Sequence, residues 1–288
     1  MPGRRAALLL LLLAGCRDPA PPAATGLTDD AGVAVRLGAP PQRIISLIPA
    51  TTELVFALGA GDRLVGRTSW CDFPAEALAV PDLGNGIGPN IEAVVAARPD
   101  LVLLYKSGSN RSAAEQLRSF GIPTLELATD RMEDFDRITR LLGAALGKRE
   151  EAESLVVRTA RDLASATVQP SSRPTVFILA WDRPPMTLGR GSFLSEILER
   201  AGAHNVFDDL ATSSAPIAIE AVASRDPDFV LVSGSGEPAI AGRVEWRVVP
   251  AVRDRRFLRI DGSEFNRPSP RIGDAVRRLA AELRSAMR

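Results

Sequence analysis

The sequence predicts an α/β fold of two lobes with mainly parallel sheets, joined by a single long helix. Short apolar strands alternate with helical segments along the chain, which is the pattern of parallel sheets covered by helices on both faces. The segment IEAVVAARPDLVLL at 91–104 also recurs as IEAVASRDPDFVLV at 219–232, with eight of fourteen residues identical. A helix, a turn and a strand are therefore expected once in each half of the chain.

The first lobe is expected at 43–148. Short β-branched or apolar runs predict its strands at 43–47, 63–66, 101–104 and 124–127. The segment PATTELVFALG predicts a helix that Thr51 or Thr52 caps and Gly59 ends. Asn90 is the expected N-cap of the helix that follows.

A helical pattern from Met132 to about Ala166 leads out of the first lobe. Apolar residues recur there at intervals of three and four, and Gly147 divides the pattern in two. The second piece, at 149–168, would be about 30 Å long at 1.5 Å per residue. We expect it to be the single helix that joins the lobes.

The second lobe is expected at 173–288 and repeats the plan of the first. The strand TVFILAW opens it, and a helix capped by Ser192 and a helix from about Ile217 follow. Apolar runs at 229–232 and 257–260 predict further strands, and a final helix is expected from Pro270.

The first 42 residues predict an exported and anchored chain. Two arginines precede nine apolar residues at 6–14, a run too short for the roughly 20 residues that cross a bilayer but suited to a signal peptide at 1–15. The LAGC that follows resembles the lipobox of bacterial lipoproteins, which implies lipid on Cys16 and a periplasmic or cell-surface location. Residues 16–42 are rich in Pro, Ala and Gly, so we expect a flexible tether there.

Composition and motifs exclude several classes of function. Lys+Arg and Asp+Glu both number 35, so the basic excess typical of nucleic-acid binders is missing. One His is too few for a three-His zinc site, and we expect no metal and no cofactor. The segment GNGIGP lacks the third glycine of a dinucleotide fingerprint, and no GxxxxGKS/T phosphate loop occurs. A Ser-His-Asp site would depend on His204, which leaves an exported α/β hydrolase as a remote alternative.

Six segments together resemble a known family. They are RIISLIPATTELVFALG, TSWCDFPAEA, NIEAVVAARPDLVLLYKSG, WDRPPMTLG, IEAVASRDPDFVLV and RPSPRIGDAV. In this order they are similar to the class III substrate-binding proteins of ABC importers, above all the vitamin B12 receptors. The resemblance covers residues 43–288 and implies two Rossmann-like lobes on one rigid helix. It also implies a monomer without catalytic activity that delivers a small-molecule ligand to a two-fold permease dimer with its ATPase.

The resemblance implies a ligand site between the lobes. The loops that follow the strands are expected to face this space, as in other open α/β sheets. The residues expected there are Pro49, Thr51, Trp70 and Tyr105 from the first lobe and Trp181, Met186, Phe265 and Arg267 from the second. Core positions remain the alternative for Trp181 and Phe265, and a role next to the final helix remains the alternative for Arg267. Two aromatic positions of the B12 receptors are Gly86 and Ser214 here, so an iron-siderophore or haem receptor remains the alternative to a cobalamin receptor.

The repeated segment places a glutamate second in each copy, at Glu92 and Glu220. In the family that the chain resembles, one glutamate on each lobe docks to arginines of the permease dimer, which implies the same role here. An acid in the first turn of a helix also interacts favourably with the helix dipole, by about 0.3–1 kcal/mol. This local role remains the alternative to docking.

Overall fold

The structure is a computed structural model that describes residues 25–288. The signal peptide expected at 1–15 and the lipid site expected at Cys16 lie outside the described residues. Within residues 25–288, no helix is both long enough and apolar enough to cross a membrane.

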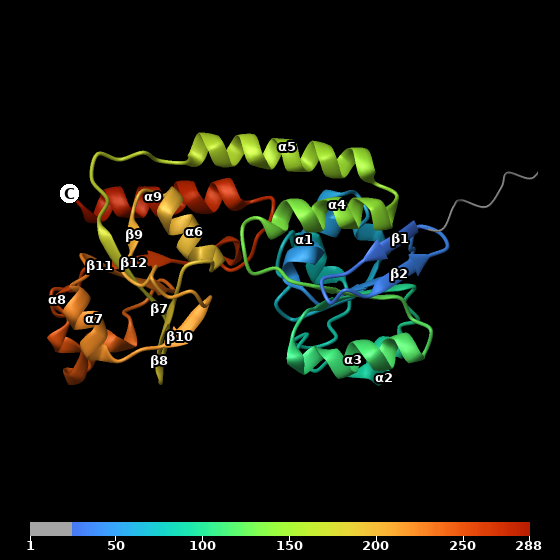
Figure 1. The fold of residues 1–288 in the computed structure, drawn as a ribbon, viewed down its shortest axis with the longest axis horizontal. Helices are drawn as coiled ribbons and strands as arrows, with labels where there is room; N and C mark the ends of the chain where they lie inside the picture. The colour runs from blue at the N-terminus through green and yellow to red at the C-terminus, as the bar shows by residue number, and fades with distance from the viewer. Residues whose placement is uncertain (1–24) are drawn as a thin grey trace, which may run out of the picture.

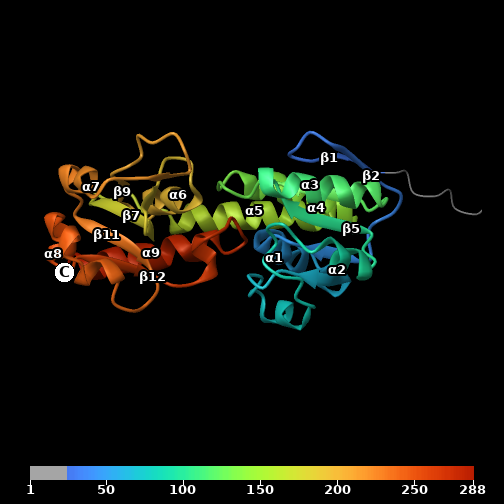
Figure 2. The same ribbon diagram turned by 90° about the horizontal axis from the view of Figure 1, so that it is seen from below.

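Two α/β lobes lie side by side along the long axis of the molecule (Figures 1 and 2). The first lobe contains a parallel four-stranded sheet in the order β4-β3-β5-β6. Its strands are β3 (Ile44–Ser46), β4 (Leu64–Arg67), β5 (Leu101–Tyr105) and β6 (Thr124–Leu127). All four strands lie where the sequence predicts them, because each is a short apolar run that is buried in the lobe.

The second lobe contains a six-stranded sheet that is parallel at its centre and antiparallel at one edge. The parallel strands are β7 (Thr175–Asp182), β9 (His204–Asn205), β11 (Phe229–Ser233) and β12 (Phe257–Ile260). The antiparallel strands are β8 (Pro185–Leu188) and β10 (Ser214–Pro216). The predicted fold class, two lobes with mainly parallel sheets, is confirmed.

Helices cover both faces of each sheet. The helices of the first lobe are α1 (Pro49–Ala57), α2 (Ile91–Ala96), α3 (Gly108–Ser119) and α4 (Asp134–Leu146). Those of the second are α6 (Phe193–Arg200), α7 (Ile219–Arg225), α8 (Pro250–Arg253) and α9 (Ile272–Ala286). Short 3₁₀ helices occur at Gly61–Arg63, Ala75–Ala79, Ala239–Gly242, Val244–Val248 and Ser263–Phe265.

Most of the predicted helix ends are confirmed. The side chains of Asn90 and Ser192 accept hydrogen bonds from the backbone N–H three residues ahead, and Gly147 ends α4 with a left-handed φ of 72°. The cap expected from Thr51 or Thr52 is wrong. Helix α1 begins at Pro49, and the hydroxyls of both threonines instead donate to the carbonyl of Ile48.

Helix α5 (Arg149–Ala166) joins the lobes and packs on both of them (Figure 1). Its 18 residues span about 27 Å. It contacts α4 in the first lobe and α9 in the second, where Arg277 forms an ion pair with Asp162 at 2.9 Å. The buried apolar residues of α5 belong to one hydrophobic core that runs from the first lobe into the second, so the helix fixes the lobes to each other.

Residues 25–37 form a hairpin on the first lobe, so the tether predicted over 16–42 is wrong in this part. Strands β1 (Thr25–Thr28) and β2 (Ala34–Leu37) pair antiparallel, and Val35 and Leu37 are buried in the core. Asp29, in the turn, forms an ion pair with Arg118 of α3 at 2.7 Å. The hairpin is therefore part of the folded lobe, which begins well before residue 43.

Candidate functional site

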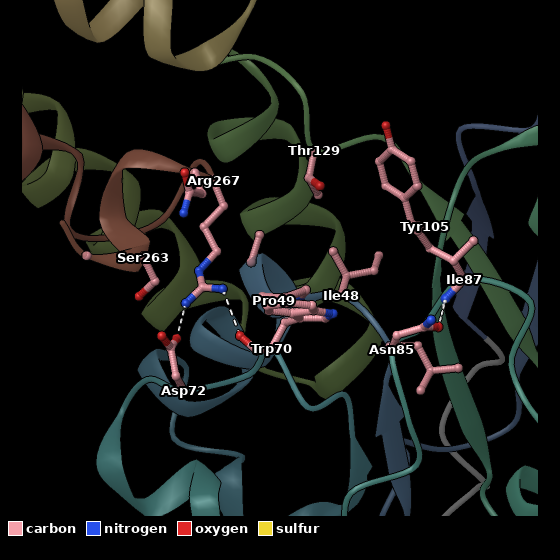
Figure 3. A pocket seen from close by; sticks show the side chains of 15 residues that line it. Ile48, Pro49, Trp70, Asp72, Asn85, Ile87, Tyr105, Thr129, Ser263 and Arg267 are labelled. Atoms are coloured by element: carbon pink, nitrogen blue, oxygen red, sulfur yellow. Dashed lines mark hydrogen bonds and ion pairs between the residues drawn. The ribbon is translucent and has the colours of Figure 1, made fainter. Parts of the chain in front are cut away.

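A cleft of about 550 Å³ lies between the lobes at the ends of the strands (Figure 3). Its walls are formed by the last residue of β5 and by residues that follow β3, β4 and β6 of the first lobe and β12 of the second. They are Leu47, Ile48, Pro49, Ala50, Trp70, Asp72, Asn85, Gly86, Ile87, Tyr105, Thr129, Gly262, Ser263, Asn266 and Arg267. The cleft thus lies at the carboxyl ends of parallel strands, where open α/β sheets bind ligands.

Four of the eight ligand-binding residues expected from the sequence line this cleft: Pro49, Trp70, Tyr105 and Arg267. Pro49 opens α1 at its floor, and Trp70 stands at its mouth with 66% of its surface exposed. Thr51 lies beneath the floor and is fully buried, where its hydroxyl bonds to the Ser46 hydroxyl at 2.7 Å. Its contribution is to hold the loop between β3 and α1.

The other three expected residues lie outside the wall of this cleft. Trp181 and Met186 are cross-strand neighbours in the β7–β8 hairpin. Trp181 is 61% exposed, and its indole N–H donates to the carbonyl of Arg183 at 2.8 Å. Phe265 is 2% exposed and belongs to the core, although it also borders a smaller cavity next to the cleft.

Tyr105 reaches the cleft from the end of β5 and forms a hydrogen bond with Asp130. Its hydroxyl donates to the Oδ1 of Asp130 at 2.5 Å. Burial and the neighbouring carboxylate raise the pKa of the Tyr105 hydroxyl well above its ordinary value. The phenol is therefore held in its neutral, hydrogen-bond-donating form.

Arg267 crosses from the second lobe to the first and is paired there twice. Its Nε donates to Glu53 of α1 at 2.7 Å, and its Nη2 forms an ion pair with Asp72. In a third hydrogen bond, Nη1 donates to the carbonyl of Trp70 at 3.1 Å. Figure 3 shows the guanidinium group of Arg267 between Asp72 and Trp70. The positive charge of Arg267 is thus neutralised by carboxylates of the protein itself.

Glu53 is the centre of this network between the lobes. Its side chain is 1% exposed and also accepts hydrogen bonds from Arg271 at 2.7 and 2.9 Å. Burial alone would raise the pKa of Asp72, but the charge and hydrogen bond of Arg267 and the Ser263 hydroxyl lower it overall. Arg271 also forms an ion pair with Glu264 at 2.9 Å. Two guanidinium groups therefore face three carboxylates, and the cleft has no free positive charge from its lining residues.

The loop at 85–88 forms one wall of the cleft and requires a glycine. Gly86 has a φ of 79°, and a Cβ there would lie 2.6 Å from the carbonyl oxygen of Leu47. The buried side chain of Asn110 holds the loop, since it donates to the carbonyl of Gly86 at 3.2 Å and accepts from the N–H of Gly88 at 2.9 Å. An aromatic residue at Gly86 would require a different loop.

His204, the residue on which a hydrolase site would depend, lies away from the cleft. His204 lies on β9, with its Nδ1 3.0 Å from a carboxylate oxygen of Glu199, and does not line the cleft. In the part of the chain that the structure describes, no group of three His, Cys, Asp or Glu side chains could hold a metal ion.

The sequence did not single out Asp72, Asn85, Thr129, Ser263 or Asn266 for the cleft. Asp72 stands in the segment TSWCDFPAEA that supports the resemblance, so its place in the motif was a usable signal. The others are small polar residues after strands, a pattern that occurs in many loops without function.

Glu92 and Glu220 both lie exposed in the first turn of their helices, α2 and α7. These helices are on different lobes, on the side of the molecule away from α5 (Figure 1). The repeated segments therefore form corresponding helices and strands in the two lobes.

Two α/β lobes on a shared helix, with an open cleft between them, define a substrate-binding protein of the two-lobed class. Residues 44–264 match the family model described as Periplasmic binding protein. The chain belongs to this family, and the class recognised from its six segments is confirmed.

Relatives agree with this assignment. The vitamin B12-binding protein of Pectobacterium carotovorum subsp. carotovorum (strain PC1) is 28% identical over 247 residues, covering 84% of this chain and 88% of that protein. The ABC transporter substrate-binding lipoprotein YvrC of Bacillus subtilis (strain 168) is 29% identical over 303 residues, covering 96% of this chain and 95% of that protein. The periplasmic heme-binding protein RhuT from Roseiflexus sp. RS-1, solved in apo form, has a TM-score of 0.77 at 25% identity, covering 86% of this chain and 99% of that one. The family and these relatives are substrate-binding transport proteins, so the chain is a binding protein and not an enzyme.

Proposed function

We propose that this chain is an exported, lipid-anchored receptor of an ABC importer that captures cobalamin or a related corrinoid between its lobes. It then delivers the ligand to a two-fold permease whose ATPase supplies the energy. The observation that carries the choice of ligand is the charge-compensated cleft, in which Arg267 is paired to Glu53 and Asp72. Lipid on Cys16 is supported by the LAGC segment and by the lipoprotein from B. subtilis.

Cobalamin suits a cleft without free positive charge. Its metal is already held by the corrin ring, and its periphery consists largely of uncharged amides, so it needs neither a metal ligand nor a cluster of arginines from the protein. The exposed ring of Trp70 and the side chain of Ile87, both at the mouth, offer apolar surface to a large flat ligand.

Haem or an iron chelate is the alternative within the class, and the likeness to the heme-binding protein favours it. Haem brings two carboxylates and needs an axial ligand. Among the residues that line the cleft, Tyr105 is the side chain suited to bind iron, but Asp130 holds its hydroxyl and raises its pKa. A tyrosinate ligand is disfavoured by this arrangement, which supports cobalamin over haem.

Calorimetric titration of the protein from residue 25 onward tests the ligand. We expect saturable one-to-one binding of cyanocobalamin, and weaker or no binding of haem and ferric siderophores. Trp70→Ala should weaken cyanocobalamin binding by about tenfold or more. Phe120→Ala, at an aromatic residue that is 63% exposed and does not line the cleft, is the matched control and should bind normally. Tight haem binding without cyanocobalamin binding would make haem the proposed ligand in place of cobalamin, and the chain would remain a substrate-binding protein.

The β7–β8 hairpin is part of the proposed ligand surface through Trp181 and Met186. Both residues stand outside the cleft wall, so a ligand larger than the cleft could reach them where it protrudes. Trp181→Ala tests this: a loss of affinity comparable to that of Trp70→Ala supports the contact, and unchanged affinity removes the hairpin from the site.

Glu92 and Glu220 are proposed to dock to the two halves of the permease. In support, both are exposed, both lie on the same side of the molecule, and neither forms an ion pair within residues 25–288. The double change Glu92→Ala with Glu220→Ala should abolish transport while ligand affinity stays the same. Glu150→Ala, at an exposed first-turn acid of α5, is the matched control. Normal transport by the double variant would assign both glutamates to the helix dipole alone.

A further inference from the structure

A second, smaller cavity adjoins the ligand cleft. It has a volume of about 240 Å³, and Thr129 and Asn266 line both spaces. Its other walls combine the loop after β6 with hydroxyl-bearing and apolar residues of the second lobe. The ligand space between the lobes is therefore longer than the main cleft alone.

Asp130 stands at the junction of the two cavities. It is the charged residue in the wall of the smaller one, and it accepts the hydrogen bond of Tyr105, which lines the larger one. Figure 3 shows Tyr105 across the cleft from Arg267. The Asp130 carboxylate is thus oriented by a residue of the proposed ligand site.

The cations closest to Asp130 in the chain are committed to other acids. Arg131 pairs with Glu133 and Glu196, and Arg137 pairs with Asp134 of the same helix, α4, and with Asp30 of the hairpin. Within residues 25–288, Asp130 itself forms no ion pair.

The lining of the combined space therefore carries one uncompensated negative charge. The larger cavity contributes Asp72 and Arg267, which are paired with each other, and the smaller one contributes Asp130. Ser213 and Ser214 add hydroxyls on the opposite lobe, which suit uncharged polar groups.

We propose that Asp130 is a specificity-determining residue that selects ligands with amide or ammonium groups and rejects ligands with a carboxylate at this point. This inference rests on the proposed function and names the charge class of its ligand. A carboxylate accepts strong, charge-assisted hydrogen bonds from N–H groups. It repels an anion, and the repulsion is larger in a partly desolvated cleft than in water.

Cyanocobalamin and its monocarboxylic acids, in which one peripheral amide is hydrolysed, test the proposal directly. At neutral pH we expect at least one acid to bind the unchanged protein about tenfold more weakly than cyanocobalamin. The isosteric change Asp130→Asn should reduce this difference in affinity to about threefold or less. Asp136→Asn, at a partly exposed acid of α4 that lines neither cavity, should leave this difference in affinity unchanged. The proposal is overturned if the unchanged protein binds cyanocobalamin and all of its monocarboxylic acids equally. It is also overturned if the difference in affinity is as large in Asp130→Asn as in the unchanged protein.

A second ligand series separates failure of this inference from failure of the proposed function. If cyanocobalamin does not bind, the same variants are titrated with cationic ferrioxamine B, uncharged ferrichrome and anionic ferric enterobactin. Tighter binding of the cationic or uncharged chelate than of the anionic one, with a smaller difference in Asp130→Asn, supports the charge selection by Asp130. The proposed ligand would then change from cobalamin to an iron chelate. Tight binding of the anionic chelate that Asp130→Asn leaves unchanged overturns the selection, and lack of binding by every ligand overturns both.

Discussion

Glu53→Gln is expected to destabilise the protein by about 3–5 kcal/mol, the usual cost of removing one partner from a buried ion pair. Glu53 lies on α1 of the first lobe, and its side chain is 1% exposed. Arg267 and Arg271 of the second lobe donate three hydrogen bonds to it at 2.7–2.9 Å. A glutamine keeps the shape but leaves both guanidinium groups beside an uncharged amide, and so without their shared counter-charge.

Equilibrium unfolding in urea, followed by far-ultraviolet circular dichroism, measures this loss. The matched control is Glu153→Gln. The Glu153 carboxylate also bonds an arginine at 2.9 Å, that of Arg140, but both side chains are about half exposed. Water replaces such a contact at little cost, so we expect no measurable change there. The reasoning is refuted if Glu53→Gln lowers the free energy of unfolding no more than Glu153→Gln does.

The same variant should also change ligand preference. Without Glu53, Arg267 keeps Asp72 and Arg271 keeps Glu264 as carboxylate partners, so the wall of the cleft loses one negative charge and becomes less negative. Ligands with a carboxylate should then gain affinity relative to uncharged ones. A destabilised variant with unchanged preference would show that the network fixes the lobes without setting the charge of the cleft.

Two further outcomes follow from the structure. Tyr105 is the single tyrosine of the chain, so absorbance at 295 nm reports its ionisation alone. The Tyr105 phenol should remain neutral above pH about 10, where a free tyrosine ionises. Asp130→Asn should lower the pKa of Tyr105, because it removes the neighbouring negative charge. Because its pKa is raised in the folded state, the stability that Tyr105 contributes is complete below pH about 10 and is lost as the pH rises further. A protein that starts at Arg43 lacks Val35 and Leu37, whose burial is worth about 1.5–3 kcal/mol each, and it should unfold at lower urea concentration than one that starts at Thr25. Equal midpoints would mean that the hairpin does not stabilise the lobe.

Elements with long or strong sequence signals could be predicted. The apolar runs of β5 and β6 and the helix that Gly147 ends lie where their patterns indicate, because burial on both faces and a left-handed glycine leave marks on local sequence. The hairpin at 25–37 could not be predicted in this way. Its alternation of buried and exposed residues covers only a few positions among Pro, Ala and Gly, and its anchor, Arg118, lies 89 residues from Asp29.

The candidate site could be predicted only where one residue type has one obvious use. Trp70 and Tyr105 stood out because large aromatic residues in loops are rare in this chain. The charge of the cleft could not be deduced, since it depends on Glu53, a glutamate inside an apolar helix whose partner Arg267 is 214 residues away. The sequence therefore predicted Arg267 only as a ligand-binding residue, whereas in the fold its charge is already neutralised by Glu53 and Asp72.

The two lobes are alike on one side of the molecule and unlike on the other. The repeated segments give α2 with β5 and α7 with β11, each with an exposed glutamate, on the side away from α5. The cleft has no such symmetry, because the first lobe supplies four of its strand ends and the second supplies only the loop after β12. A two-fold permease would contact two equal surfaces, whereas a corrinoid has no two-fold axis and needs unequal walls. The proposed docking and the proposed ligand thus account for the symmetry of one side and its loss on the other.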